Sequence, residues 1–253
     1  MLFDTHAHYY DRAFDADRDQ ILSALPGSGV GLELCPGCDL PTSREAIALA
    51  ERYPHVYAAA GVHPEDALNL PENWLTELER LTRHPKVKAI GEIGLDYYWK
   101  EVPRDLQKEV FRAQLTLATQ LNLPVIVHDR EAHGDCLSIV QDFPQVRGVF
   151  HCYSGSAEDA KQLIKWGWHL SFTGTITFKN ARKAPEVIQA VPLERLMVET
   201  DAPYMAPTPY RGKRCDSRYV YRMAETIAEI KGLPVEEVVR ITTENGKRLF
   251  AIN

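Results

Sequence analysis

The feature that most constrains this chain is a short, apolar, β-prone segment that recurs eight times, each time followed by a stretch of helical character. The ends of these segments lie about 28 residues apart on average, which is the length that one strand, one helix and two short loops require. This alternation predicts a single α/β domain over residues 1–253, folded as a (β/α)8 TIM barrel. The predicted strands cover residues 3–6, 30–34, 56–63, 87–92, 125–128, 149–151, 170–173 and 196–201.

The segments between the predicted strands carry helix signals. Over residues 103–122, apolar side chains recur at steps of three and four, which indicates one buried helix face. Thr42 and Glu45 fit a capping box at a helix start, and Ser156 with Asp159 forms a looser version of it. An apolar stripe over residues 220–230 and a helix opened by Pro234 predict extra C-terminal helices after the eighth strand.

The competing α/β architecture is a doubly wound sheet. That fold would place a glycine-rich turn between the first strand and its helix. The glycines at positions 27, 29 and 31 instead precede the second strand and read as a turn that ends a helix. No linker rich in Gly, Ser or Pro divides the chain, so one barrel is the prediction.

Composition excludes several classes of protein. A hydrophobic content of 45% argues against disorder, and no apolar run approaches the roughly 18 residues of a membrane span. The 29 basic and 35 acidic residues give a net charge of −6, which argues against non-specific coating of nucleic acid. The first residues lack a secretory signal, and the five scattered cysteines make a poor disulfide framework, so a cytoplasmic location is expected.

Six residues that can ligate metals fall at the ends of predicted strands. His6 and His8 share one face of the first strand because strand side chains alternate. Barrel enzymes keep their active sites at these carboxyl ends, and burying so many polar groups without partners would be costly. The full set is His6, His8, Glu92, His128, His151 and Asp201.

These side chains predict a centre of two divalent metals. Imidazole and carboxylate without thiolate suit Zn²⁺, Mn²⁺ or Mg²⁺. Six ligands are too many for one catalytic ion with an open position, so two ions that share a bridging carboxylate are expected.

Several motifs together resemble the TatD family of metal-dependent deoxyribonucleases, within the amidohydrolase-like barrels. The resemblance covers essentially the whole chain and implies that His6, His8 and Asp201 hold one metal, His128 and His151 hold the other, and Glu92 bridges them. The matching segments are residues 3–8, 61–64, 91–97, 128–132, 151–155 and 199–203. The chain departs from the family pattern at 215–217, where it reads Cys-Asp-Ser.

A second set of residues is expected around this centre. Glu199 lies on the same face as Asp201 and is expected to bond a ligand histidine. The resemblance suggests that His63 contacts a substrate phosphate, with a structural turn as the alternative. Arg130 is a further candidate because a guanidinium group matches phosphate geometry, with a salt bridge at a helix start as the alternative. The basic cluster at 210–214 is another, because barrels often bind phosphate near the loops after strands seven and eight, with a solvated loop as the alternative. The candidate substrate-binding residues are therefore His63, Arg130, Arg211, Lys213 and Arg214. Cys35 and Cys38 have a CxxC spacing but lack a thioredoxin context.

The expected activity is metal-dependent hydrolysis of DNA phosphodiester bonds, from single-stranded ends. Asp201, Glu92 and Glu199 are the expected catalytic carboxylates, with Asp201 as general base. The alternatives are an ester hydrolase such as a D-aminoacyl-tRNA deacylase, or a catalytically inactive barrel that acts as a scaffold. DNA is the expected partner, as substrate; neither a membrane nor an obligate protein partner is expected.

Overall fold

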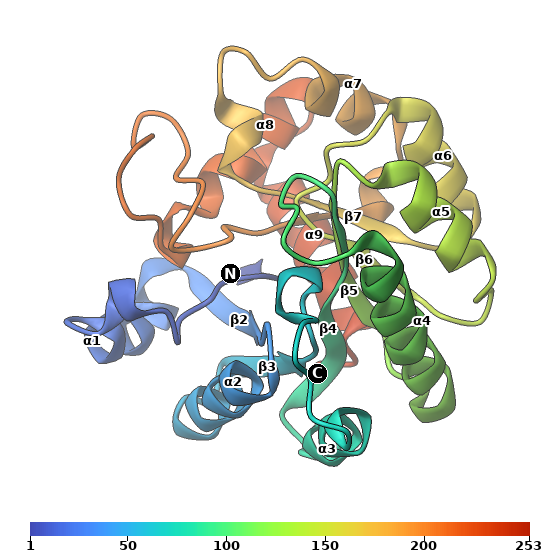
Figure 1. The fold of residues 1–253 in the computed structure, drawn as a ribbon. Helices are drawn as coiled ribbons and strands as arrows, with labels where there is room; N and C mark the ends of the chain where they lie inside the picture. The colour runs from blue at the N-terminus through green and yellow to red at the C-terminus, as the bar shows by residue number, and fades with distance from the viewer.

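A computed structural model describes all residues, 1–253, and shows eight parallel strands that form a nearly closed barrel with helices around it (Figure 1). Each strand pairs with the next along the chain, so the predicted TIM-barrel fold is confirmed. The strands are β1 (Leu2–Asp4), β2 (Val30–Pro36), β3 (Val56–Ala60), β4 (Val87–Asp96), β5 (Val125–Arg130), β6 (Gly148–Phe150), β7 (His169–Phe172) and β8 (Leu196–Val198).

Nine α-helices accompany the strands, and the predicted C-terminal pair follows β8. None of them combines the length and the apolar character that crossing a membrane would need. The helices are α1 (Arg18–Ala24), α2 (Leu40–Arg52), α3 (Trp74–Thr82), α4 (Arg104–Leu121), α5 (His133–Gln141), α6 (Ala157–Lys165), α7 (Lys183–Ala190), α8 (Tyr221–Lys231) and α9 (Val235–Leu249).

The barrel is joined between its last and first strands by side chains as well as backbone. β1 and β8 stop earlier than predicted, at Asp4 and Val198. Just beyond these points, Asp4 Oδ1 accepts a hydrogen bond from the Thr200 backbone at 2.9 Å, and Asp4 Oδ2 accepts one from the Thr200 hydroxyl at 2.6 Å. Farther along, the backbone of Asp201 donates to His6 O at 2.9 Å. The buried Asp4 carboxylate thus takes the place of a backbone carbonyl as the partner of the Thr200 N–H group. The segments that follow β1 and β8 can therefore separate from each other and reach the site.

Two helix starts test the capping predictions. Ser156 caps α6 as expected, because its hydroxyl accepts from the Asp159 backbone. At α2 the predicted cap was wrong: Asp39 is the cap, and Thr42 is the third helical residue of a capping box. Asp39 accepts from the Thr42 backbone at 2.7 Å, so an acidic side chain lies at the positive end of the helix dipole.

A separate apolar cluster fills the inside of the barrel. Seven strands each contribute one buried residue to it. On each strand that has a candidate site residue at or near its end, the cluster residue comes earlier in the chain, so the cluster lies below the site. The C-terminal Phe250 and Ile252 join the same cluster, and the rings of Phe3 and Phe250 meet edge to face at 6.0 Å. The segment after α9 therefore closes the barrel interior on the side away from the strand ends. The strand members are Phe3, Leu34, Ala59, Ala89, Ile126, Val149 and Met197.

Removing this closure should cost much of the folding stability. Phe250 is 1% exposed, so Phe250→Ala is expected to lower the free energy of unfolding by about 3–5 kcal/mol. Urea unfolding followed by circular dichroism measures this, with Leu68→Ala, at a residue 42% exposed, as the matched surface control. A loss below about 1 kcal/mol for Phe250→Ala would contradict a closed, well-packed interior.

Candidate metal centre

All six predicted ligands lie in the carboxyl-terminal half of a strand or just beyond its end. His6 and His8 follow β1, His151 follows β6 and Asp201 follows β8, whereas Glu92 and His128 lie within β4 and β5. Five of the six line one cavity of about 1060 Å³, and His6 is completely buried beneath it. The barrel therefore gathers side chains that are up to 195 residues apart in the chain.

On one side of Glu92, four ligand atoms converge. The Nε2 atoms of His6 and His8 lie 3.1 Å apart, and the His6 Nε2 atom lies 3.2 Å from Glu92 Oε2. Asp201 Oδ1 lies 3.3 Å from His8 Nε2 and 3.7 Å from His6 Nε2. Tetrahedral ligands 2.0–2.2 Å from an ion are separated by about 3.3–3.6 Å. The distances here, 3.1–3.7 Å, lie close to that range, so the four atoms could surround a small divalent cation after minor adjustment.

On the other side of Glu92, two further histidines meet the second oxygen. His128 Nδ1 and His151 Nε2 each lie 2.8 Å from Glu92 Oε1, and these two nitrogens are 3.3 Å apart. One carboxylate therefore faces both groups, Oε2 toward the first and Oε1 toward the second. This is the placement expected of a bridging ligand.

Each of these two rings lies between two carboxylates. His128 Nδ1 faces Glu92 while its Nε2 atom is 2.9 Å from Asp96 Oδ2, so a proton on Nε2 would leave the Nδ1 lone pair facing Glu92. His151 Nδ1 faces Glu199 Oε1 at 3.4 Å without a hydrogen bond, and a proton on Nδ1 would leave the Nε2 lone pair facing Glu92. A metal ion bound against Glu92 Oε1 would need both inner nitrogens in this lone-pair form.

His8 is oriented in the same way on the first side. Its Nδ1 atom is 2.8 Å from Tyr10 Oη, and the Tyr10 hydroxyl itself donates to Cys38 Sγ at 3.2 Å. His8 Nδ1 therefore carries the proton, and its Nε2 lone pair faces the other ligand atoms. His6 Nδ1 is buried without a hydrogen-bond partner. The atoms that face one another here are imidazole nitrogens and carboxylate oxygens, which are suitable ligands for a divalent metal.

The electrostatics of the cluster point the same way. Burial opposes the charge on Glu92, but His151 and His6 outweigh it and hold the pKa of Glu92 well below its usual range. Burial also works against a charged His151, yet Glu92 and Glu199 raise the pKa of its ring well above the ordinary value. The cluster thus attracts positive charge, and without a metal a proton supplies it.

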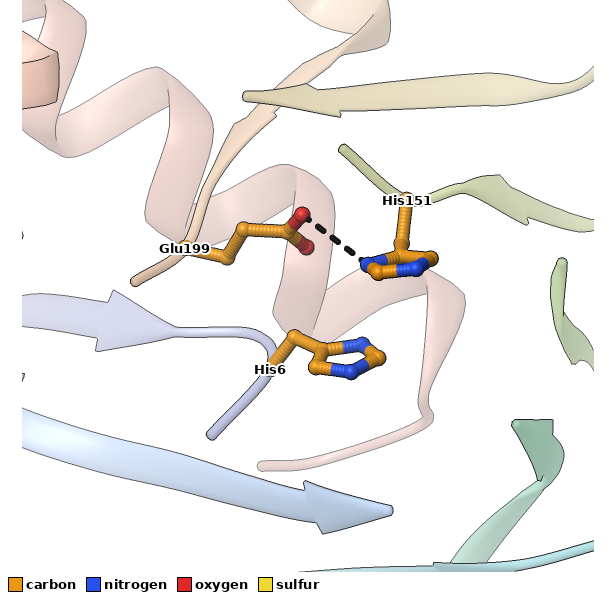
Figure 2. A group of neighbouring side chains, drawn as sticks. All are labelled: His6, His151 and Glu199. Atoms are coloured by element: carbon orange, nitrogen blue, oxygen red, sulfur yellow. Dashed lines mark ion pairs between the residues drawn. The ribbon is translucent and has the colours of Figure 1, made fainter. Parts of the chain in front are cut away.

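Glu199 is completely buried beneath the ligand rings. Its Oε1 accepts a hydrogen bond from the Cys152 backbone and its Oε2 accepts one from the Ser171 hydroxyl, both at 2.6 Å. Figure 2 shows the Glu199 carboxylate directed at His151, whose ring stacks on that of His6 at 4.1 Å. Glu199 is therefore placed to hold His151 in position, and it does not line the cavity.

Asp96 is a site residue that the sequence analysis missed. Its Oδ2 atom holds His128, while its Oδ1 atom accepts from the backbones of Tyr98 and Trp99 at 2.9 and 3.1 Å. A signal was present: Asp96 is four residues beyond Glu92, which puts both on one face of a strand. Ending the predicted strand at Glu92, rather than at Asp96, hid it.

His63 joins the cluster from the end of β3. Its Nε2 atom lies 3.7 Å from Glu92 Oε1, and its ring meets that of His128 edge to face at 4.3 Å. Burial and the nearby His128 lower the pKa of His63 to about 3, so the ring is neutral. Because Nδ1 accepts from the Glu65 backbone at 3.2 Å, the proton lies on Nε2. His63 therefore presents a hydrogen-bond donor to the cavity and not a metal-binding lone pair.

The basic residues divide into two groups. Arg130 lines the cavity, but the cluster at 210–214 does not. Arg214 forms a two-pronged pair with the Asp17 carboxylate, at 2.8 and 2.6 Å, and Arg211 lies over the ring of Phe178 at 4.4 Å. Lys213 is exposed and outside the cavity wall. The structure thus gives Arg214 a structural partner.

Two cations that the sequence analysis missed line the cavity instead. Arg182 and Lys183, at the start of α7, are exposed on its wall. Three basic residues within 179–183 follow the seventh strand, and barrels often bind phosphate beyond strands seven and eight. This signal was present in the sequence, but the prediction chose the cluster at 210–214 because basic residues are denser there.

Comparison with known proteins gives one consistent result. The model of the family described as TatD related DNase matches residues 3–251. A Bacillus subtilis protein named "Uncharacterized metal-dependent hydrolase YabD" is 46% identical over the full length of both chains. An Escherichia fergusonii protein named "3'-5' ssDNA/RNA exonuclease TatD" is 31% identical, also over all of both. The crystal structure of the TatD homologue YjjV from Escherichia coli superimposes with a TM-score of 0.94 at 30% identity, covering 100% of this chain and 98% of that one.

Binding of a divalent cation should stabilise the fold, because the ligand atoms converge only in the folded state. At a metal concentration of 1,000 times the dissociation constant, the gain is about 4 kcal/mol, or roughly 8–16 °C in Tm for a chain of this size. Differential scanning fluorimetry of metal-stripped protein with and without Zn²⁺ or Mn²⁺ measures it. The shift should shrink in His151→Ala and persist in His84→Ala, whose histidine pairs with Glu51 on the outer surface. No shift in the parent protein would contradict the fit.

Proposed function

The chain belongs to the family of TatD-related DNases, which includes metal-dependent hydrolases, and we propose that it hydrolyses DNA phosphodiester bonds from single-stranded ends. The observation that carries the proposal is Glu92, whose two oxygens face two separate groups of metal-binding atoms. One relative's name, a single-stranded DNA and RNA exonuclease, supports the substrate class.

We assign His6, His8 and Asp201 to one metal and His128 and His151 to the other, with Glu92 between them. This division follows the two oxygens of Glu92 described above. Mg²⁺, Mn²⁺ or Zn²⁺ bound there would lower the pKa of a water and neutralise the phosphate charge. The ring partners, Asp96 and Glu199, keep the histidine lone pairs directed inward.

Asp201 is the proposed general base. It lines the cavity and is 7% exposed, so a water in the cavity can reach this mostly buried carboxylate. Its Oδ1 atom faces the histidines, while Oδ2 makes no hydrogen bond within the protein. Burial opposes its ionisation, but His8 and His6 hold the pKa of Asp201 below its usual value, which keeps it able to accept a proton.

Two donors are placed to hold the phosphate. His63 directs its Nε2 proton into the cavity, and Arg130 offers guanidinium N–H groups from the wall. Both therefore suit non-bridging phosphate oxygens. Arg182 and Lys183 also line the cavity and add positive charge to it, which favours a polyanionic substrate.

Metal content tests the division between two ions. Protein purified with ample metal is expected to hold two divalent ions per chain by elemental analysis. His128→Ala combined with His151→Ala should lose one ion and keep the other, because the first group keeps all its ligands. His55→Ala, at a histidine that bonds Leu22 O away from the cavity, should keep both. One ion in the parent protein under saturating supply would overturn the two-metal assignment.

Activity tests the role of Asp201. Asp201→Asn keeps the size and one ligating oxygen but cannot accept a proton, so kcat on a labelled single-stranded oligonucleotide should fall by about 10²–10⁴-fold. Glu199→Gln should cost about 10–100-fold, because that residue only orients His151. Elemental analysis of each variant shows whether metal is retained. A larger loss for Glu199→Gln would reverse the roles, and hydrolysis of aminoacyl esters but not of DNA by the parent protein would refute the proposed substrate.

A further inference from the structure

Two large aromatic side chains stand exposed at the mouth of the cavity. Tyr98 is 47% exposed and Trp99 is 45% exposed, and their rings meet edge to face at 4.9 Å. They lie in the segment that joins β4 to α4, drawn in green in Figure 1. Trp99 lines the cavity that holds the candidate metal centre. Neither ring is needed for the core, so this exposed apolar surface calls for another explanation.

Arg130 completes the surface. Its guanidinium carbon lies 3.9 Å from the centre of the Tyr98 ring and 6.0 Å from that of Trp99. Arg130 is exposed and forms no ion pair with a carboxylate, so its N–H edges remain free while its face stacks. Planar guanidinium can use its face for an aromatic ring and its edge for a phosphate at the same time. One side chain therefore joins an aromatic platform to a phosphate-binding donor.

The Asp96 carboxylate fixes this platform relative to the metal centre. It holds His128 with one oxygen and the backbones of Tyr98 and Trp99 with the other. The backbone of Asp96 is itself held by the Gln107 side chain, which accepts from its N–H and donates to its carbonyl, both at 2.9 Å. The aromatic rings thus have a set position with respect to a candidate ligand, which an ordinary surface loop lacks.

We propose that Tyr98, Trp99 and Arg130 form a subsite that stacks the unpaired base of a nucleotide next to the scissile phosphate. The inference rests on the proposed nuclease function and adds the subsite to it. Aromatic faces and guanidinium planes stack on any base, at about 1–3 kcal/mol per base, whereas a paired base keeps its faces covered by its neighbours. The cations Arg182 and Lys183 on the same cavity wall complement the phosphates of such a strand. The site therefore favours single strands with little preference for sequence.

Kinetics on matched substrates tests the subsite. Tyr98→Ala combined with Trp99→Ala should raise KM for a single-stranded oligonucleotide by about 10–100-fold, the loss of one stacked base. The effect on a fully abasic oligonucleotide of the same length should stay below about threefold in kcat/KM, because this substrate has no base to stack. Tyr221→Ala, at a residue 42% exposed on α8 and outside this cavity, is the aromatic control and should leave both substrates unaffected.

An abasic substrate separates stacking from a general effect on the loop. Oligonucleotides that lack one base, at each of the three terminal positions in turn, should include one that the parent protein binds about 10–100-fold more weakly. The double variant should not distinguish that oligonucleotide from the intact one. A double variant with unchanged KM, or one that still loses affinity for every abasic oligonucleotide, would overturn the subsite and leave the nuclease function standing.

A binding measurement keeps the test decisive if no DNA is cleaved. In that event the proposed function fails, and quenching of Trp99 fluorescence by a single-stranded oligonucleotide tests the subsite by itself. The parent protein should show saturable quenching that Trp99→Phe abolishes and that duplex of the same sequence produces at least tenfold more weakly. Absence of quenching, or equal quenching by duplex, would reject the base-stacking subsite.

Discussion

The structure at the strand ends depends on one buried carboxylate that has histidine nitrogens against both of its oxygens. Glu92 is 3% exposed, and it meets His6 at 3.2 Å on one oxygen and both His128 and His151 at 2.8 Å on the other. A buried carboxylate in this position needs positive charge beside it, which either ring protons or a metal ion can supply. The barrel provides the rigid frame that keeps these groups together, and a divalent cation would fit among them.

A layer of partners behind the ligands makes this arrangement specific. Asp96, Glu199 and Tyr10 each face the outer nitrogen of one histidine, so each of these histidines can hold its proton there and offer its inner nitrogen to a metal. His63 follows the opposite rule, since its inner nitrogen carries the proton. The same ring chemistry thus yields three oriented ligands and one donor, and the difference lies only in which backbone or side-chain group each ring meets.

The order of the strands and the six candidate ligands could be predicted because both are periodic or local signals. Eight apolar segments at even spacing fix the barrel, and strand alternation puts His6 and His8 on one face. What could not be predicted depends on tertiary contact. Arg214 reads as a free cation in the sequence, but Asp17, 197 residues away in the chain, binds it. Asp96 could have been found, because it lies four residues beyond Glu92 on the same strand, and only its contact with His128 required the fold. The proton position on His63 follows from a local contact of its Nδ1 atom with the Glu65 backbone, which the sequence does not reveal.

The central claim, that Glu92 lies between two divalent ions, is tested most directly by anomalous diffraction from crystals grown with Mn²⁺. The account predicts two anomalous peaks roughly 3.5–4 Å apart, one on each side of the Glu92 carboxylate. One peak should lie against His6, His8 and Asp201, and the other against His128 and His151. A single peak at saturating Mn²⁺, or two peaks that do not share Glu92, would contradict it.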